Sequence, residues 1–191
     1  AGINEASDGD TVLAQPGTYT ENINNNNKNL VIQSSGGPES TIIEPSETNT
    51  SVVTLSYAEI NGFTIQGGNT NGNGGGMTAH YSTIQNCIIK NNNARDGAGL
   101  YGSNLTVNGC TISNNSATVF NSGHRGGGIY FSGGTNSVTG TDIMNNEANT
   151  GNGSVAGGGV YILTGSTSID SSRITGNSIR DNMTGNNTHG G

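Results

Sequence analysis

The sequence predicts an all-β fold, a single-stranded right-handed parallel β-helix with three short strands per coil, because three patterns recur at the length of one coil. A six-residue segment that begins and ends with an aliphatic residue recurs at intervals of 24, 23, 31 and 31 residues. A glycine-rich run and a single asparagine recur with it. The six-residue segments, each of which we interpret as one repeated short strand, are residues 60–65, 84–89, 107–112, 138–143 and 169–174.

The first 56 residues follow the same plan less regularly, and we expect them to form the N-terminal coils. Alternating and β-branched residues between turn residues indicate further short strands there. These strands are residues 8–13, 16–23, 29–33, 41–44 and 51–55. No linker separates them from the regular glycine-rich coils of residues 57–191, so we expect residues 1–191 to form a single domain.

Two columns of aliphatic residues are expected to form the core. Strands in register lie about 4.8 Å apart, so equivalent residues of successive coils would touch. Burying each aliphatic side chain contributes about 1.5–3 kcal/mol, and the columns together make a core that no single coil could make. The first column is Ile60, Ile84, Val107, Val138 and Ile169, and the second is Ile65, Ile89, Ile112, Ile143 and Ile174.

An asparagine lies three residues after each of the last four isoleucines of the second column. Asparagine tolerates the left-handed backbone of a tight corner, and stacked amides can hydrogen-bond from coil to coil. We therefore expect a structural ladder of corner asparagines with interior-facing amides. Its members are Asn92, Asn115, Asn146 and Asn177.

The glycine runs lead into a strand whose first aliphatic residue points inward, so the next residue points outward. At this outward position three coils carry a tyrosine: Tyr101, Tyr130 and Tyr161. An aromatic row at coil spacing can stack on sugar rings, or it can pack over the strand backbone and under neighbouring loops, which is the interpretation we prefer. Loops of variable length on one side, residues 93–96, 116–125, 147–156 and 178–189, are where a solenoid usually carries its function.

Cys87 and Cys110 occupy one inward column together with Phe63, Thr141 and Ser172. Their expected separation of about 4.8 Å between adjacent coils falls within the range of disulfides. Parallel neighbours in register orient their side chains side by side, however, and this favours two buried free thiols. Two sulfurs without a histidine in the same column do not suggest a zinc site.

Residues 6–12 and 16–19 resemble the opening coil of the pectate-lyase-like right-handed β-helix superfamily. The runs of glycine, aliphatic residue and tyrosine are similar to those of secreted bacterial β-helix repeat proteins and of chlamydial polymorphic outer-membrane proteins. The resemblance implies the same fold and a capping helix of which residues 1–6 are the last turn. It implies no single activity, because the superfamily contains lyases, hydrolases, epimerases and adhesins.

The residues give little support to catalysis. The hydrolases' Asp-Asp pair and Gly-His-Gly motif are missing, since Arg125 follows His124, and Asp142 and Asp170 fall at different positions of the repeat. A lyase would need a calcium-binding group of acids and a base. The charged loop residues are more simply solvated: Arg95, Asp96, His124, Arg125, Glu147, Arg180, Asp181 and His189. We expect no catalytic or metal-ligating residue and no cofactor, and calcium has no support.

The composition argues against two kinds of partner, nucleic acid and the membrane interior. A net charge of −7 with only six Lys and Arg argues against nucleic acid, and there is no apolar run long enough to span a membrane. Charged residues are 10% and hydrophobic residues 29%, a low content that suits disorder or a thin solenoid core, and the aliphatic columns favour the solenoid.

We therefore expect a non-catalytic structural and adhesive module of a secreted or cell-surface bacterial protein. Its partners would be cell-surface glycans, bound through Tyr101, Tyr130, Tyr161, His124 and Arg125, or other chains and copies of itself in an extracellular assembly such as a filament. The alternative is a polysaccharide-active lyase or glycoside hydrolase, and ice binding is opposed by the irregular outward threonines. Both ends cut through a repeat, so we expect a fragment of a longer chain or a last coil covered by another chain.

Overall fold

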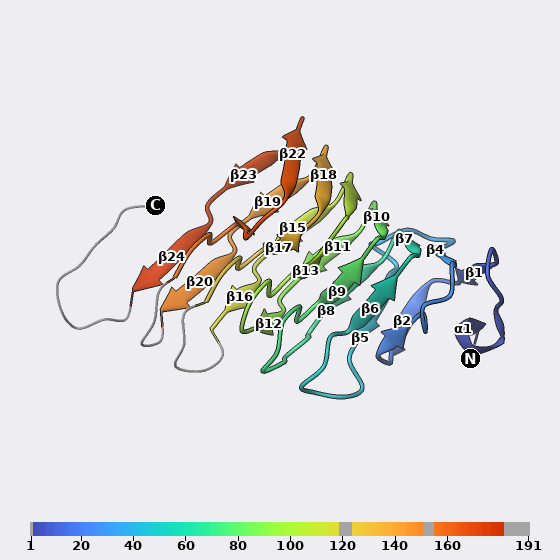
Figure 1. The fold of residues 1–191 in the computed structure, drawn as a ribbon. Coiled ribbons are helices and arrows are strands. Elements are labelled where there is room, and N and C mark those ends of the chain that lie inside the picture. The colour runs from blue at the N-terminus through green and yellow to red at the C-terminus, as the bar shows by residue number, and fades with distance from the viewer. Residues whose placement is uncertain (1, 119–123, 151–154, 182–191) are drawn as a thin grey trace.

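A computed structural model describes residues 2–118, 124–150 and 155–181 and shows a parallel β-helix (Figure 1). A short helix, α1 (Gly2–Glu5), precedes the first coil, in agreement with the expected capping turn. The chain then winds through short strands that stack on their equivalents in the next coil, and every pair of neighbouring strands is parallel. Successive coils thus lie side by side from the N-terminal to the C-terminal end (Figure 1).

Two sheets of seven strands form two faces of the solenoid. Sheet A contains β1 (Thr11–Ala14), β4 (Val31–Ser34), β7 (Glu59–Asn61), β10 (Thr83–Gln85), β14 (Thr106–Asn108), β18 (Thr135–Thr139) and β22 (Ser166–Asp170). Sheet B contains β2 (Gly17–Thr20), β5 (Thr41–Glu44), β8 (Thr64–Gln66), β11 (Ile88–Lys90), β15 (Thr111–Ser113), β19 (Asp142–Met144) and β23 (Arg173–Thr175).

The third face is sheet C, and the later coils add a small sheet D. Sheet C contains β3 (Ile23–Asn24), β6 (Val53–Ser56), β9 (Met77–His80), β13 (Leu100–Ser103), β17 (Ile129–Gly133) and β21 (Val160–Ile162). Sheet D contains β12 (Asn93–Ala94), β16 (Ser116–Ala117), β20 (Glu147–Thr150) and β24 (Ser178–Asp181). Sheet D corrects the expectation of three strands per coil, because the variable loops begin as paired strands.

The predicted register of both aliphatic columns is confirmed. Ile84 pairs with Ile60 and Val107 in sheet A, and Ile89 pairs with Ile65 and Ile112 in sheet B. These side chains are fully buried, as are Val138 and Ile143 of the next coil. Ile169 and Ile174 are 39% and 49% exposed, since the last described coil has a neighbouring coil on only one side.

The six-residue segment is two strands rather than one. Ile60 lies in β7 of sheet A and Ile65 lies in β8 of sheet B, so the chain bends between them. The bend has a left-handed residue in every such coil, at Gly62, Asn86, Gly109, Gly140 and Ser171. A corner within the repeat explains why both of its aliphatic ends point into the core from different faces.

The four asparagines form a row of hydrogen-bonded amides between coils, in which Asn92, Asn115 and Asn146 are buried and Asn177 is half-buried. Asn115 Nδ2 donates to Ile89 O and to Asn146 Oδ1, both at 3.0 Å. Its Oδ1 accepts from the backbone N and the Nδ2 of Asn92, at 3.1 and 3.0 Å. Asn146 repeats this pattern toward Asn177. Each such amide has two donated and two accepted hydrogen bonds, so a polar group sits inside the solenoid without an unsatisfied atom.

The left-handed corner residue is one position earlier than the sequence suggested. Asn91, Asn114 and Asn145 have φ of 55° and are exposed, and Gly176 takes this place in the last coil with φ of 66°. The residue that follows each of them turns its amide inward as the ladder. The corner therefore needs two adjacent residues with different roles, of which asparagine can fill both.

The ladder lies against the last glycine of each glycine run. A Cβ added to Gly76, Gly99 or Gly128 would lie 2.7, 2.8 or 2.9 Å from the Nδ2 of the ladder asparagine in its own coil. Such distances are too short for a real side chain, so the ladder asparagine requires a glycine opposite it. The carbonyl oxygen of the equivalent glycine in the next coil, 2.6–2.7 Å from the same added Cβ, imposes the same requirement. Sheet C can close onto the corner only where this glycine is present.

A lysine holds the N-terminal helix. Lys28 Nζ donates to the carbonyl oxygens of Ile3, Asn4 and Ala6 at 2.9, 2.9 and 2.8 Å. Carbonyls at the end of a helix have no intrahelical partner, and a cation there interacts favourably with them. Lys28 thus fastens α1 to the first coils.

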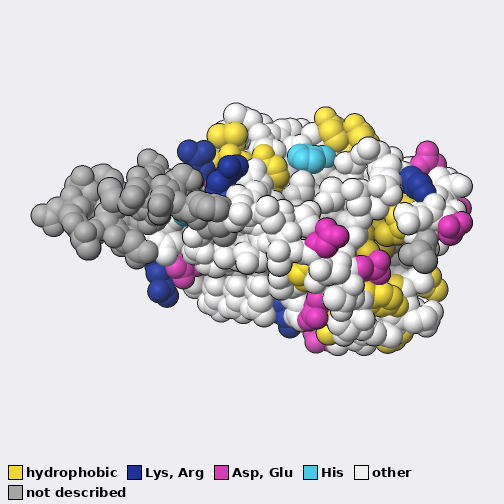
Figure 2. Space-filling view, turned by 90° about the horizontal axis from the view of Figure 1, so that it is seen from below, with side chains coloured by type: hydrophobic (Ala, Val, Ile, Leu, Met, Phe, Trp, Pro, Cys, Tyr) yellow, Lys and Arg dark blue, Asp and Glu magenta, His cyan; other side chains and the backbone are white. Residues whose placement is uncertain are grey.

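The outer face of sheet A carries rows of short, uncharged polar side chains. One row is Thr83, Thr106, Ser137 and Ser168, and the next is Gln85, Asn108 and Thr139. Figure 2, which shows the molecule from below the view of Figure 1 and not the face of sheet A, also has its charged side chains scattered among many uncharged ones. The rows of sheet A are built mainly of hydroxyl and amide groups, with Glu59 beside Thr83 and Asp170 beside Thr139 as their charged members.

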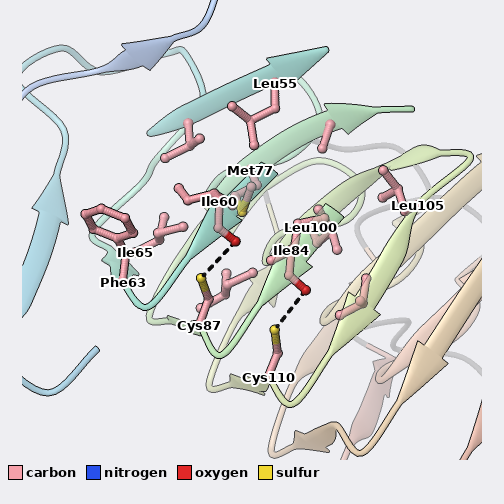
Figure 3. Packing of buried hydrophobic residues seen from close by; sticks show 14 of the residues in the cluster. Leu55, Ile60, Phe63, Ile65, Met77, Ile84, Cys87, Leu100, Leu105 and Cys110 are labelled. Carbon is pink, nitrogen blue, oxygen red and sulfur yellow. Dashed lines mark hydrogen bonds between the residues drawn. The ribbon is translucent and has the colours of Figure 1, made fainter. Parts of the chain in front are cut away.

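The two cysteines are buried free thiols, as the sequence favoured. Figure 3 shows Cys87 and Cys110 in adjacent coils, with the Sγ of each directed at a carbonyl of the preceding coil. The sulfur atoms lie 3.9 Å from Ile60 O and 3.6 Å from Ile84 O. Burial raises the pKa of Cys87 to about 11 and raises the pKa of Cys110 further, so both thiols stay protonated at neutral pH.

Replacing Ile112 or Ile143 with Asp should destabilise the protein by about 3–5 kcal/mol, because it places a carboxylate without a partner in the core. Urea unfolding followed by circular dichroism measures the loss. Thr106→Asp, on the exposed face of β14, is the matched control and should leave stability nearly unchanged. Equal stability of the two kinds of variant would contradict the stacked columns.

The contact between glycine and ladder predicts a coupled pair in the last coil, where the three atoms nearest a Cβ on Gly159 all belong to Asn177. Gly159→Ala should cost about 1–3 kcal/mol through this overlap. Adding it to Asn177→Ala should cost little more than Asn177→Ala alone, since the overlapping group is gone. A double-mutant cycle tests this: the free energy of unfolding is measured for the parent, both single variants and the double variant. If the two single losses of free energy simply added in the double variant, the contact would be refuted.

Candidate functional site

The tyrosine row lies on the outer face of sheet C, as predicted. Tyr101, Tyr130 and Tyr161 are paired in register in β13, β17 and β21. The ring centroids of successive tyrosines are 5.1 and 5.0 Å apart, with interplanar angles of 29° and 39°. Tyr101 and Tyr130 are therefore stacked and Tyr161 is tilted against Tyr130, so the three rings pack on one another from coil to coil.

The row is mostly packed. Tyr130 is only 5% exposed, and Tyr101 and Tyr161 are half-buried. The guanidinium of Arg125 lies 5.6 Å from the centre of the Tyr161 ring, within the range of a cation–π contact. Burial raises the pKa of Tyr130, and a hydrogen bond to Arg125 partly opposes this. The geometry agrees with a packing role for the central ring and leaves little of its face for a sugar.

Backbone bridges between adjacent coils position Arg125 and His124. Asp96 bridges to Arg125, whose backbone N donates to Asp96 Oδ1 at 3.0 Å. Arg95 Nε lies 3.2 Å from Asp96 Oδ2. His124 is fully buried, with Nδ1 3.0 Å from Arg95 O. Of the two candidates, Arg125 thus lies beside the tyrosine row, while His124 lies beneath the surface that was expected to carry it.

Other charged candidates form ion pairs between adjacent coils. Arg180 Nε lies 3.1 Å from Glu147 Oε2 in sheet D, and Arg173 Nη2 lies 2.9 Å from Asp142 Oδ2 in sheet B. Asp170 ends β22 in sheet A, so it lies on a different face from Asp142. Within residues 2–118, 124–150 and 155–181 no three His, Cys, Asp or Glu side chains group as a metal site requires. His189 lies outside the described residues.

A second aromatic pair was not identified from the sequence. Tyr57 and Tyr81 stack with their ring centroids 4.9 Å apart and their planes within 7°, and they are 57% and 54% exposed. Both lie at the corner between sheet C and sheet A, directly after β6 and β9. A signal was present, because each tyrosine precedes a core isoleucine, Ile60 or Ile84, by three residues.

This pair occupies a costly backbone conformation. Tyr57 and Tyr81 have φ of 57° and 51°, whereas later coils carry Asn104, Gly134 and Gly165 at this corner. All other left-handed residues in the described chain are glycines or asparagines, apart from Ser171. The left-handed backbone costs a bulky residue about 1–2 kcal/mol, and an aromatic pair returns about 0.5–1.5 kcal/mol. Stacking does not offset two such residues, so their presence calls for another reason.

His80 lies between the two aromatic groups. Its ring meets Tyr101 edge to face with the centroids 6.3 Å apart, and Nδ1 lies 2.9 Å from Ser103 Oγ. Partial burial lowers the pKa of His80. The imidazole is therefore neutral at physiological pH and belongs to an uncharged aromatic strip across sheet C.

Comparisons of the chain with protein-family models, with curated proteins and with solved structures found no match. None of the helical structure in the described ranges is long and apolar enough to cross a membrane.

Tyr130→Ala should destabilise the protein by about 2–4 kcal/mol, because it removes a buried ring stacked on both sides. Thr78→Ala provides the matched control, since Thr78 occupies the same row in β9 and loses only a methyl group and a hydroxyl bonded to Ser51 and to Asn73 O. This control should cost about 1 kcal/mol. The thermal unfolding temperatures of the parent and the two variants test whether the ring packs. A Tyr130 variant as stable as the parent would show that it does not.

Proposed function

We propose that the chain is a non-catalytic structural and adhesive module of a secreted or cell-surface protein, related to the pectate-lyase-like β-helices. The observation that carries this proposal is the outer face of sheet A, where hydroxyl and amide side chains repeat in register from coil to coil. Such rows offer many weak hydrogen-bonding groups at a fixed spacing of about 4.8 Å. They suit contact with a repeating partner such as a glycan or another chain.

The scaffold supports this role mechanically. Backbone hydrogen bonds join every described coil to the next, and the ladder amides add a continuous row inside. Opening one coil would leave these polar groups unsatisfied, so the rows keep their spacing under load. The resemblance to secreted bacterial β-helix repeat proteins supports the secreted or cell-surface location.

The charged groups support adhesion over catalysis. Glu147 and Asp142 each pair with an arginine of the next coil, an arrangement that ties coils together. The candidate His124 is buried and bonded to a backbone carbonyl, where it would have to leave the interior to move a substrate proton. The alternative is a polysaccharide-active enzyme, which would release products from its substrate.

Incubation of the protein with pectin or alginate, with and without added calcium, should release neither unsaturated products nor reducing ends. Insoluble cellulose or chitin should retain the protein in a sedimentation assay. Measurable release that is lost on changing His124 or Arg125, with folding verified by circular dichroism, would establish the enzyme instead. Failure to bind any glycan and to self-associate would refute the adhesive role.

A further inference from the structure

We propose that Tyr57 and Tyr81 form a binding site for the sugar rings of an uncharged polysaccharide. This inference rests on the proposed adhesive function and places it at the corner between sheets C and A. Its basis is the exposed, parallel ring pair in left-handed turns, which the packing of the coils does not require. An observed backbone outlier of this kind is evidence from which a function can be inferred.

The site is rigid before any ligand arrives. Tyr57 N donates to His80 O at 3.1 Å, and Tyr81 N donates to Ser103 O at 3.0 Å, so coil stacking fixes both backbones. Mutual stacking then holds the rings parallel. A preformed aromatic surface loses little conformational freedom on binding.

The ring chemistry suits a sugar. Stacking covers one face of each tyrosine ring and leaves its outer face to a sugar. That outer face carries partial negative charge, and the C–H groups on the face of a pyranose carry partial positive charge, so the two attract. Tyrosine adds a hydroxyl that can hydrogen-bond the sugar hydroxyls. The pair can therefore contact both the C–H groups and the hydroxyl groups of a hexose.

Asparagine amides flank the pair along the same corner. Asn25 binds the backbone of Ser56 through Nδ2–O and N–Oδ1 distances of 2.6 and 3.0 Å, which places the exposed turn of Asn26 and Asn27 one coil before Tyr57. Asn104 follows Tyr81 one coil later at the same corner. Amides on both sides extend the site along the solenoid axis, so we infer a chain of sugars rather than a single residue.

The charges near the pair favour an uncharged polymer. Glu59 lies on the outer face of sheet A two residues after Tyr57, and the protein carries a net charge of −7. The nearby Lys28 is committed to three carbonyls of the N-terminal helix. An acidic glycan would meet repulsion from this net charge, and Lys28 has no N–H left with which to bind a carboxylate.

The tyrosine row of sheet C is a weaker candidate for the same ligand. Its central ring, Tyr130, is 5% exposed, whereas Tyr57 and Tyr81 are both more than half exposed. Substitutions in the two groups should have different effects. A change in the tyrosine row should lower stability, whereas a change in the corner pair should lower binding.

The test compares the parent with a Tyr57→Asn/Tyr81→Asn variant, which uses the residue that the corner already carries at Asn104 and so keeps the left-handed turns. Tyr57→Phe/Tyr81→Phe keeps both ring faces and is the matched control. Affinities for cellulose, chitin and beads of calcium alginate are measured by depletion of the protein from solution. We expect the parent and the Phe variant to bind an uncharged polymer and the Asn variant to lose about tenfold or more in affinity without losing stability.

Soluble oligosaccharides of the bound polymer provide a direct readout, since ring protons of a sugar stacked on the pair should move upfield in NMR spectra with the parent and not with the Asn variant. Unchanged affinity of the Asn variant would overturn this site while leaving the adhesive function in place. A parent that binds none of the uncharged polymers, or that prefers alginate, would overturn it as well. Cleavage of a bound polymer would instead refute the non-catalytic function.

Discussion

The contact between the asparagine ladder and the glycine opposite it is the constraint on which the rest of the solenoid depends. The amides of Asn115 and Asn146 each donate twice and accept twice, and they can do so only where the chain on sheet C passes without a Cβ. The corner and the third face are thereby held at a fixed separation. A polar row inside the molecule is stable because every bond is made, and it specifies the register because a slipped coil would break all four.

This constraint accounts for the composition. The thin core needs only one or two aliphatic residues per strand, such as Ile84 and Ile89, and the corners take asparagine and glycine. Beside the main core a second cluster of Ala94, Ala98, Ala117 and Ala148 fills the narrow space between sheet D and the glycine runs. Small side chains are required there because the two backbones approach closely. A sequence low in hydrophobic residues can therefore fold without a large core.

The outer surface divides into side chains that hold coils together and side chains that are free to bind. Ion pairs such as Arg173 with Asp142, and the row of rings centred on Tyr130, join successive coils on the outside as the ladder amides do in the interior. The corner tyrosines differ, since they are exposed and strained where asparagine or glycine would be relaxed. Tyrosines thus have two roles in this protein: those of the row pack between coils, and those at the corner of sheets C and A are exposed to a ligand.

The sequence by itself determined the parallel β-helix, the residues of its core columns and the ladder asparagines, because stacking in register turns spatial neighbours into equivalent positions of a repeat. It also favoured free thiols and a packed tyrosine row. Only the tertiary structure decided that the six-residue repeat bends, that Asn114 rather than Asn115 is left-handed, that His124 is buried and that Tyr57 stacks on Tyr81. These features depend on where a backbone turns and on how closely two coils approach, and a linear pattern of residue types carries neither quantity.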